Sequence, residues 1–193
     1  MKKLILASKS PYRKALLERL GLQFEVAASG YDESILKSQI QDPEELTRQL
    51  SLAKARSIKS EAGEVVIGSD QVCVLGQEIM GKPGSIQNAE KQLMKLSGKT
   101  HFLITSYAIV GDDFEIVKTN KTSLRMRELN VNQVKNYLTM DNPVDCAGAY
   151  KLELNGISLM EFIETSDHTA ITGLPLIDLA RDLVGIGFQI PPE

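Results

Sequence analysis

Apolar and polar positions form short blocks along the chain, which predict a mixture of strands and helices. Apolar residues at 4–7 predict a short strand, and Ser10-Pro11 then starts a helix over about 11–20 that Gly21 closes. The pattern also predicts strands at 24–28, 64–75, 101–110, 114–127, 149–153 and 157–163, and helices at 43–59, 88–96, 131–138 and 176–184. Because strands and helices mix without strict βαβ regularity, we expect an α/β fold with a mixed sheet flanked by helices.

The strand expected at 64–75 carries an unusual acidic residue. Its run of β-branched residues contains one glycine, Gly68, which indicates a bulge or kink, and Asp70 interrupts the apolar run. Burying a carboxylate is unfavourable unless a metal, a cation or hydrogen bonds compensate it. Asp70 is therefore either a functional group or an exposed residue at a strand bulge.

The turn after the first strand combines hydroxyl groups and cations at a helix N-terminus. Ser8, Lys9, Ser10 and Arg13 lie where free backbone N–H groups also gather, and this combination can bind an anion. The alternative is a plain Ser-Pro helix cap with solvated charges. Arg13 and Lys9 are needed beyond a cap only if the ligand is a phosphate.

Further charged residues could join such a site. Asp32 and Glu33, in an acidic loop, offer carboxylates for a divalent ion, and Lys54 could project from its helix into the same cleft. Lys82 follows a hairpin that could return it to the mouth of the Asp70 strand. For each of these residues, the alternative is an ordinary solvated charge.

Composition limits the classes of protein to consider. With 193 residues, 42% of them hydrophobic, the chain fits one domain over 1–193 or two closely packed lobes. Its formal charge of −3 argues against a nucleic-acid partner, and no apolar run is long enough for a membrane helix. Cys73 and Cys146 lie far apart with no metal-binding spacing, which suits a reducing cytoplasm. The opening apolar run breaks at 8–11, too early for a secretory signal.

Several common catalytic classes lack their motifs. His101 and His168 are too few and too scattered for a metal cluster, and no Gly-x-Ser-x-Gly elbow supports a serine nucleophile. Neither Gly-x-Gly-x-x-Gly nor a Walker loop is present, which argues against a dinucleotide site and a P-loop.

The motifs taken in order resemble a known family. The chain contains Leu-Ala-Ser-Lys-Ser-Pro-Tyr-Arg, Asp-Glu-Ser, Leu-Ala-Lys-Ala, Ile-Gly-Ser-Asp-Gln-Val, Gly-Lys-Pro, Leu-Ser-Gly-Lys-Thr-His, Cys-Ala-Gly-Ala-Tyr and Gly-Leu-Pro-Leu. This set, from Leu6 to about Leu183, resembles the Maf-like nucleotide pyrophosphatases. The resemblance implies an elongated, twisted mixed sheet akin to the inosine triphosphate pyrophosphatases, with two lobes around a central cleft. It also implies hydrolysis of a nucleoside triphosphate to monophosphate and pyrophosphate with Mg²⁺ or Mn²⁺.

The resemblance assigns roles to individual residues. Asp70 matches the catalytic carboxylate and, with Glu33, the metal-binding side of the site. The positions that resemble the phosphate-binding set are Ser8, Arg13, Lys54 and Lys82. Such a set suits the chemistry, because a base can orient the water that attacks the α-phosphorus, while metal and cations spread the charge of the leaving pyrophosphate.

Three positions resemble one subgroup of the family. Enzymes of the family that cleave dTTP and UTP carry arginine, threonine and glutamine where this chain has Tyr12, Gln71 and Glu153. The chain instead resembles the subgroup that hydrolyses 7-methyl-GTP, which has an aromatic residue and a glutamate at the outer two positions. An aromatic face attracts the positive charge of 7-methylguanine, and Glu153 could accept the guanine N1–H and N2–H. Tyrosine is a weaker cation–π partner than the tryptophan of that subgroup.

Two other functions remain open from the sequence. One is hydrolysis of dTTP and UTP, and the other is a nucleotide-binding regulator of cell division without useful turnover. The regulator would keep Tyr12 and Glu153 but would not require Asp70. The expected role of the enzyme is to remove modified nucleotides, and the resemblance also implies a homodimer.

Overall fold

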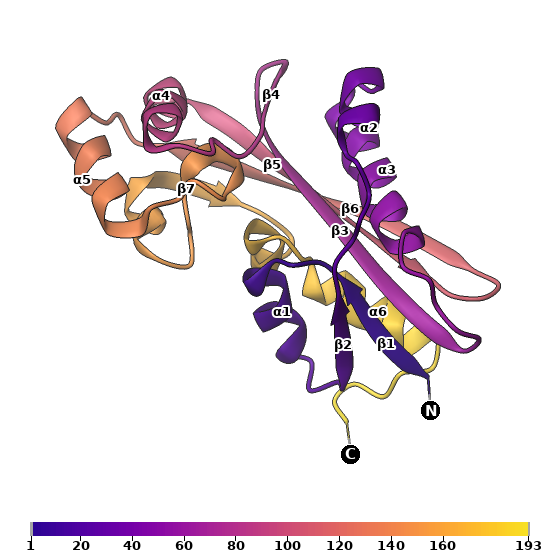
Figure 1. Cartoon of the computed structure of the whole chain (residues 1–193). Helices are drawn as coiled ribbons and strands as arrows, with labels where there is room; N and C mark the ends of the chain where they lie inside the picture. The colour runs from indigo at the N-terminus through magenta and orange to yellow at the C-terminus, as the bar shows by residue number, and fades with distance from the viewer. Residues whose placement is uncertain (1, 193) are drawn as a thin grey trace. The chain divides into compact units, whose positions relative to one another are not determined.

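The computed structural model describes residues 2–192 and contains one mixed β-sheet with helices packed on it (Figure 1). The strands are β1 (Lys3–Ala7), β2 (Phe24–Ala27), β3 (Glu64–Leu75), β4 (Glu78–Met80), β5 (Thr100–Val110), β6 (Glu115–Met126) and β7 (Met160–Glu164). The helices are α1 (Pro11–Glu18), α2 (Ser34–Gln39), α3 (Pro43–Arg56), α4 (Ile86–Leu96), α5 (Val131–Asp141) and α6 (Leu176–Gly185). Three short 3₁₀ helices cover Ala147–Ala149, Asn155–Leu159 and His168–Thr172.

The strand order makes the sheet mixed, as the sequence predicted. The order is β2-β1-β3-β5-β6-β7, and β4 pairs with β3 outside this path. β1 runs parallel to β2 and β3, whereas β4 is antiparallel to β3 and β7 is antiparallel to β6. The expected α/β class is therefore confirmed. Among the helices of residues 2–192, none is long and apolar enough to cross a membrane.

The chain divides into two compact units. The first unit contains the chain up to Asp70, together with Thr105–Asn120 and the residues from Asp167 onward. The second unit consists of Gln71–Ile104 and Lys121–Ser166. Strands β3, β5 and β6 contribute residues to both units.

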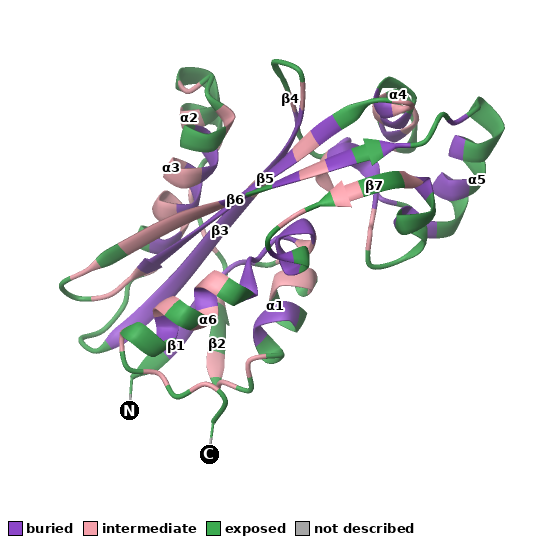
Figure 2. Cartoon of the chain, turned by 180° about the vertical axis from the view of Figure 1, so that it is seen from behind, coloured by how far each residue is buried: buried purple, intermediate pink, exposed green. Residues whose placement is uncertain are grey.

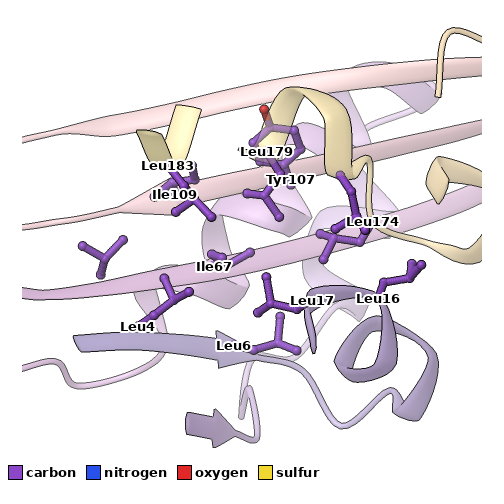
Figure 3. Close-up of a cluster of buried hydrophobic side chains, with 12 residues drawn as sticks. Leu4, Leu6, Leu16, Leu17, Ile67, Tyr107, Ile109, Leu174, Leu179 and Leu183 are labelled. Carbon is purple, nitrogen blue, oxygen red and sulfur yellow. The ribbon is translucent and has the colours of Figure 1, made fainter. Parts of the chain in front are cut away.

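The first unit has a core on each face of its part of the sheet. Figure 2 shows that β3 is buried along most of its length. Successive side chains of a strand point to opposite faces. Val65 and Ile67 accordingly pack with α1 and α6 in the apolar cluster of Figure 3, whereas Val66 packs with Ala55 of α3. Asp70 lies at an even position of β3 and so belongs to the α3 face.

Capping residues begin the two helices that carry expected site residues. Ser10 accepts a hydrogen bond from the backbone N–H of Arg13, and Pro11 is the first residue of α1, as predicted. Asp42 caps α3 in the same way by accepting from the N–H of Glu45 at 2.7 Å. Both caps satisfy N–H groups that a helix leaves unpaired at its first turn.

Gly68 brings β3 against the backbone of α3. A Cβ atom at this position would lie 2.1 Å from the carbonyl oxygen of Ser51 and 2.7 Å from the backbone nitrogen of Ala55. The regular register of β3 with β1 extends from Glu64 to Ile67, so the bulge or kink that the sequence predicts near Gly68 stays a prediction. The close approach of the two backbones, which a side chain would block, gives the physical reason for the glycine.

Three predicted segments differ from the structure. The strand predicted at 149–153 is wrong, because Gly148 and Ala149 have φ of 79° and 61° and turn the chain, and Lys151 then donates its N–H to the Tyr137 hydroxyl at 2.8 Å. The strand predicted at 157–163 begins later, at Met160, after a 3₁₀ helix. The acidic loop around 32–34 leads directly into the unpredicted helix α2.

Candidate active site

Three charged residues from separate segments of the first unit meet at one ammonium group. The Nζ of Lys54 lies 2.6 Å from Oδ1 of Asp70 and 2.6 Å from Oε1 of Glu33. The side chains of Asp70 and Lys54 are 9% and 12% exposed, whereas that of Glu33 is 33% exposed. The sequence predicts that these residues could share one cleft, and the structure brings their side chains into contact.

The local structure explains why the three side chains converge. Asp70 lies on the same face of β3 as Gly68, two residues earlier, where α3 passes closest to the strand. Lys54 is in the last turn of α3, next to Ala55, which touches Gly68. Glu33 stands directly before α2, and α2 leads into α3. Asp70 is therefore a buried, cation-paired carboxylate, and the alternative of an exposed residue at a strand bulge is wrong.

Glu33 stays ionised although it is partly buried. Burial raises the pKa of Glu33, but hydrogen bonds and ion pairs with Lys37 and Lys54 outweigh it and bring the pKa to about 2. Lys37 lies 2.5 Å from Oε2 of Glu33, one helical turn further along α2. Its neighbour Asp32 is exposed and instead accepts a hydrogen bond from the N–H of Ser34 at 2.9 Å. Of the two acidic residues in this loop, Glu33 therefore contacts Lys54.

Arg13 adds a second cation close to these carboxylates. Burial lowers the pKa of Arg13, while the negative charges of Asp70 and Glu33 raise it. Its Nε donates to the carbonyl oxygen of Gly173 at 3.0 Å, which ties the first turn of α1 to the loop before α6. The structure thus brings Arg13 into the electrostatic surroundings of the Asp70 group.

Ser8 and Tyr12 both precede Arg13, Ser8 in the turn before α1 and Tyr12 in its first turn. Ser8 is buried, and its Oγ accepts a hydrogen bond from the N–H of Ser10 at 3.1 Å. Tyr12 is half-buried in the first turn of α1. The Ser10 cap is confirmed, and it is compatible with an anion site because Ser8 and Arg13 are additional to the cap.

The carboxylates of Glu33 and Asp70 fit a divalent cation of the Mg²⁺ or Mn²⁺ type. Carboxylate oxygens are the donors that these hard cations prefer, and Mg²⁺ is usually bound by one or two carboxylates together with substrate phosphates and water. Both carboxylates already approach one cationic group, Lys54, at 2.6 Å. Within residues 2–192, no group of three or more His, Cys, Asp or Glu side chains could hold a metal ion. Glu33 and Asp70 could supply two carboxylates to such a cation, and its remaining ligands would have to come from water or a phosphate.

Lys82 lies in the second unit on a loop that is fixed at both sides. Asn88 and Gln92 of α4 donate their side-chain N–H groups to the carbonyls of Pro83 and Gly81, each at 3.1 Å. A cavity of about 330 Å³ adjoins this loop, and its lining residues include Lys82, Lys91 and Lys95. Lys82 itself is exposed, so its ammonium group is accessible to an anion.

Glu153 and Gln71 also belong to the second unit. Glu153 is exposed on the irregular segment that follows the turn at Gly148, and Gln71 is half-buried on β3 directly after Asp70. The segment of Glu153 is joined to the Lys82 loop, because Gly84 donates its N–H to the carbonyl of Val144 at 2.9 Å. The relation of these second-unit residues to the Asp70 group stays a prediction.

A buried histidine anchors the segment before Glu153. His101 is fully buried, and its Nε2 lies 2.9 Å from the hydroxyl of Tyr150, with the two rings edge to face. Burial lowers the pKa of His101 to about 4, and a backbone group of Lys99 acts in the opposite direction. The sequence had excluded His101 only as a metal ligand, because its spacing gives no signal of a contact with Tyr150.

His101 should make the protein less stable in acid. Its ordinary pKa is 6.5, so between pH 6.5 and about 4 the unfolded chain binds a proton that the folded chain does not. Between pH 7 and pH 4.5, the unfolding free energy of the wild-type protein should therefore fall by about 2 kcal/mol more than that of His101→Gln. Urea unfolding at the two pH values measures the difference. The control is His168→Gln at an exposed histidine, and an equal acid loss in wild type and His101→Gln would contradict the expectation.

The backbone of the loop before α6 is a site feature that the sequence did not reveal. The Gly-Leu-Pro-Leu motif marks this loop in the sequence, and the structure shows that the carbonyl of Gly173 accepts a hydrogen bond from Arg13. Ser69, beside Asp70, donates to the same carbonyl at 2.8 Å. A backbone carbonyl leaves no trace in residue identity, and the glycine of the motif was the available signal.

Comparisons with known proteins identify the family of the chain. A family model described as Maf-like protein matches residues 3–185. A protein of Bdellovibrio bacteriovorus named 7-methyl-GTP pyrophosphatase is 43% identical over 94% of this chain and 96% of its own length. A protein of the same name from Xanthomonas axonopodis pv. citri is 40% identical over 99% of this chain and 100% of its own length.

A solved structure with a similar fold supports the α/β class. The Staphylococcus aureus Ham1 protein matches with a TM-score of 0.51 over 96% of this chain and 100% of its own length. Its sequence identity of 16% means that this likeness concerns the fold alone. The family model and the full-length relatives together lead to a firm assignment: the chain belongs to the Maf-like protein family.

Proposed function

We propose that the protein is a nucleoside triphosphate pyrophosphatase that hydrolyses 7-methyl-GTP to 7-methyl-GMP and pyrophosphate. The observation that carries the proposal is the buried Asp70 carboxylate, held by Lys54 beside Glu33 and near the charge of Arg13. A buried carboxylate with cationic neighbours suits the attack of water on a phosphate, and the relatives named 7-methyl-GTP pyrophosphatase support this substrate.

The reaction breaks the bond between the α-phosphorus and the oxygen that bridges to the β-phosphorus. Asp70 orients the attacking water and accepts its proton, while the bridging oxygen leaves with pyrophosphate. Lys54 holds the Asp70 carboxylate in place, and Arg13 and Ser8 bind the phosphate oxygens. A divalent cation held by Glu33 and Asp70 would supply further neutralisation of the phosphate charge.

The remaining residues that the family resemblance assigns are proposed to bind other parts of the substrate. Lys82 binds the departing pyrophosphate, since its loop is fixed by α4 and its ammonium group is exposed. Tyr12 attracts the positively charged 7-methylguanine ring, and Glu153 accepts the N1–H and N2–H of guanine. Gln71 takes the position next to Asp70 at which the family's dTTP and UTP enzymes carry threonine.

Three further properties belong to the same proposal. The enzyme removes modified nucleotides in the cytoplasm, where the free thiols Cys73 and Cys146 would stay reduced. It acts as a homodimer, and a small nucleotide rather than a nucleic acid is its partner. Its mildly acidic net charge of −3 agrees with a local basic pocket instead of a broad basic surface.

The proposed activity can be measured directly. Purified protein with Mg²⁺ or Mn²⁺ is offered 7-methyl-GTP, GTP, dTTP and UTP, and pyrophosphate release is followed. We expect 7-methyl-GTP to give the highest kcat/KM, and we expect removal of the divalent cation with a chelator to abolish release. Preference for dTTP and UTP would overturn the substrate, and nucleotide binding without release would favour the regulator of cell division.

A further inference from the structure

The carbonyl oxygen of Gly173 connects Arg13 with the strand of Asp70. It accepts a hydrogen bond from Nε of Arg13 at 3.0 Å. It also lies 2.8 Å from Oγ of Ser69, whose single hydroxyl hydrogen is shared between this carbonyl and that of Ser106 at 2.9 Å. Ser69 is fully buried, and it points to the α1 and α6 face because it precedes Asp70 by one residue on β3. One backbone atom therefore contacts both the arginine and the neighbour of the catalytic aspartate.

The loop that presents this carbonyl is braced from within. Asp167 accepts hydrogen bonds from the N–H and hydroxyl of Thr169 at 2.9 and 2.6 Å and from the N–H of Ile177 at 2.7 Å. Thr169 in turn accepts from the N–H of Leu176 at 2.8 Å. Asp167 and Thr169 are both buried, so these bonds act in surroundings where they are strong.

The same loop is fastened to the sheet and to α1. Thr105 of β5 donates its hydroxyl to the carbonyl of Ala170 at 3.0 Å. Leu174 lies in the apolar cluster that also contains Leu16 and Leu17 of α1, as Figure 3 shows. The loop is therefore held at several points, and the direction of the Gly173 carbonyl is fixed.

Both the backbone conformation and the contact with Arg13 favour glycine at position 173. Gly173 has φ of 112°, a backbone conformation that other residues rarely adopt, and a Cβ atom would lie 3.2 Å from Nε of Arg13. A side chain at this position would therefore strain the loop and also crowd the guanidinium group.

We infer that the Gly173 carbonyl, braced by Ser69, Asp167 and Thr169, is a positioning element that orients Arg13 for the polyphosphate of the substrate. A bond from Nε to a fixed carbonyl sets the plane of a guanidinium, whose two terminal nitrogens then approach an oxyanion in one orientation. The inference rests on the proposed function, because that function identifies the anion that Arg13 binds as the polyphosphate of a nucleotide. The motif Gly-Leu-Pro-Leu thereby gains a role in substrate binding as well as in ending a loop.

The test compares Gly173→Ala with Gly187→Ala. Gly187 has a similar φ of 100° but no atom within 4 Å of an added Cβ, so this matched control carries the backbone strain without the contact to Arg13. We expect Gly173→Ala to raise KM for 7-methyl-GTP about tenfold or more, as for a weakened charge-assisted hydrogen bond, and to change kcat by less than about threefold. Gly187→Ala should keep the wild-type KM. Ser69→Ala, which removes one hydroxyl, should raise KM in the same direction and serves if Gly173→Ala does not fold.

A double variant separates positioning from general destabilisation. If Gly173 acts through Arg13, then Gly173→Ala should change KM by less than about twofold in an Arg13→Lys background. If Gly173→Ala still raises KM about tenfold in the Arg13→Lys background, the inference is overturned. It is also overturned if Gly187→Ala raises KM as much as Gly173→Ala does. Hydrogen exchange of the Arg13 Nε–H, identified in NMR spectra by its absence in Arg13→Lys, should be faster in Gly173→Ala than in wild type.

Binding of inorganic tripolyphosphate distinguishes this inference from the proposed function. Calorimetry should show weaker binding to Gly173→Ala than to Gly187→Ala or wild type. If wild type releases no pyrophosphate from any nucleotide but this difference in binding remains, the proposed function fails and the positioning of Arg13 stands. If wild type does not bind tripolyphosphate, or if Gly173→Ala binds it as tightly as wild type, the inference is overturned.

Discussion

Asp70→Asn should lower the rate of pyrophosphate release from 7-methyl-GTP by about a hundredfold to ten-thousandfold, the range expected for loss of a positioned general base. Asparagine keeps the shape of the side chain but can neither accept the proton of water nor bring a negative charge to a metal ion. Lys54 would still have Glu33 as an ion-pair partner at 2.6 Å, so the fold should survive. Steady-state kinetics with Mg²⁺ and Mn²⁺, together with thermal unfolding, measure both effects.

Asp182→Asn is a matched control for this variant. Asp182 is also a largely buried carboxylate of the first unit, with a side chain 11% exposed, and it is paired with Lys118 at 2.5 Å and with the Tyr107 hydroxyl at 2.6 Å. It lies in α6, outside the proposed site. We expect Asp182→Asn to lower stability and to leave kcat within about threefold of wild type. Unchanged pyrophosphate release by Asp70→Asn would contradict the proposed mechanism.

Tyr12→Arg combined with Glu153→Gln should shift the preference of the enzyme from 7-methyl-GTP towards dTTP and UTP by a hundredfold or more in the ratio of kcat/KM values, which corresponds to about 3 kcal/mol. An arginine repels the positive charge of 7-methylguanine, and a glutamine can no longer accept both the N1–H and N2–H of guanine. Competition assays with the three nucleotides measure the ratio.

Single variants and a distant glutamate control this result. Tyr12→Arg alone should weaken the binding of 7-methyl-GTP more than the binding of GTP, because only the methylated base carries the positive charge. Glu161→Gln on β7 removes a charge that is exposed and paired with Arg125 at 2.9 Å, and it should leave the preference unchanged. An unaltered ratio in the double variant would mean that Tyr12 and Glu153 do not contact the base.

Much of the fold followed from hydrophobic periodicity and caps. The long strand 64–75 was predicted with the bounds that β3 has, and the Ser10 cap and Pro11 start of α1 were correct. The segment 149–153 was wrong because its alternating apolar residues resemble a strand, whereas the left-handed backbone at Gly148 and Ala149 is set by packing. Periodicity contains no information about such a packing constraint.

The candidate site was predictable in composition but not in contacts. A carboxylate inside an apolar strand identified Asp70, while Lys54 and Glu33 needed the family resemblance because nothing in their own surroundings separates them from surface charges. Their shared ion pair depends on where α3 crosses β3, which is a property of three-dimensional packing. The roles of Gly173 and His101 escaped for the same reason, since a carbonyl and a buried imidazole take their partners from distant segments.

The contact of α3 with Gly68 has a consequence for how substitutions should be tolerated. Main-chain atoms set the clearance between helix and strand at this point. Substitutions among the neighbouring apolar side chains that conserve their volume should therefore leave the distance between Lys54 and Asp70 nearly unchanged. A single added methyl group at position 68 would instead push the helix and strand apart and separate the lysine from its aspartate.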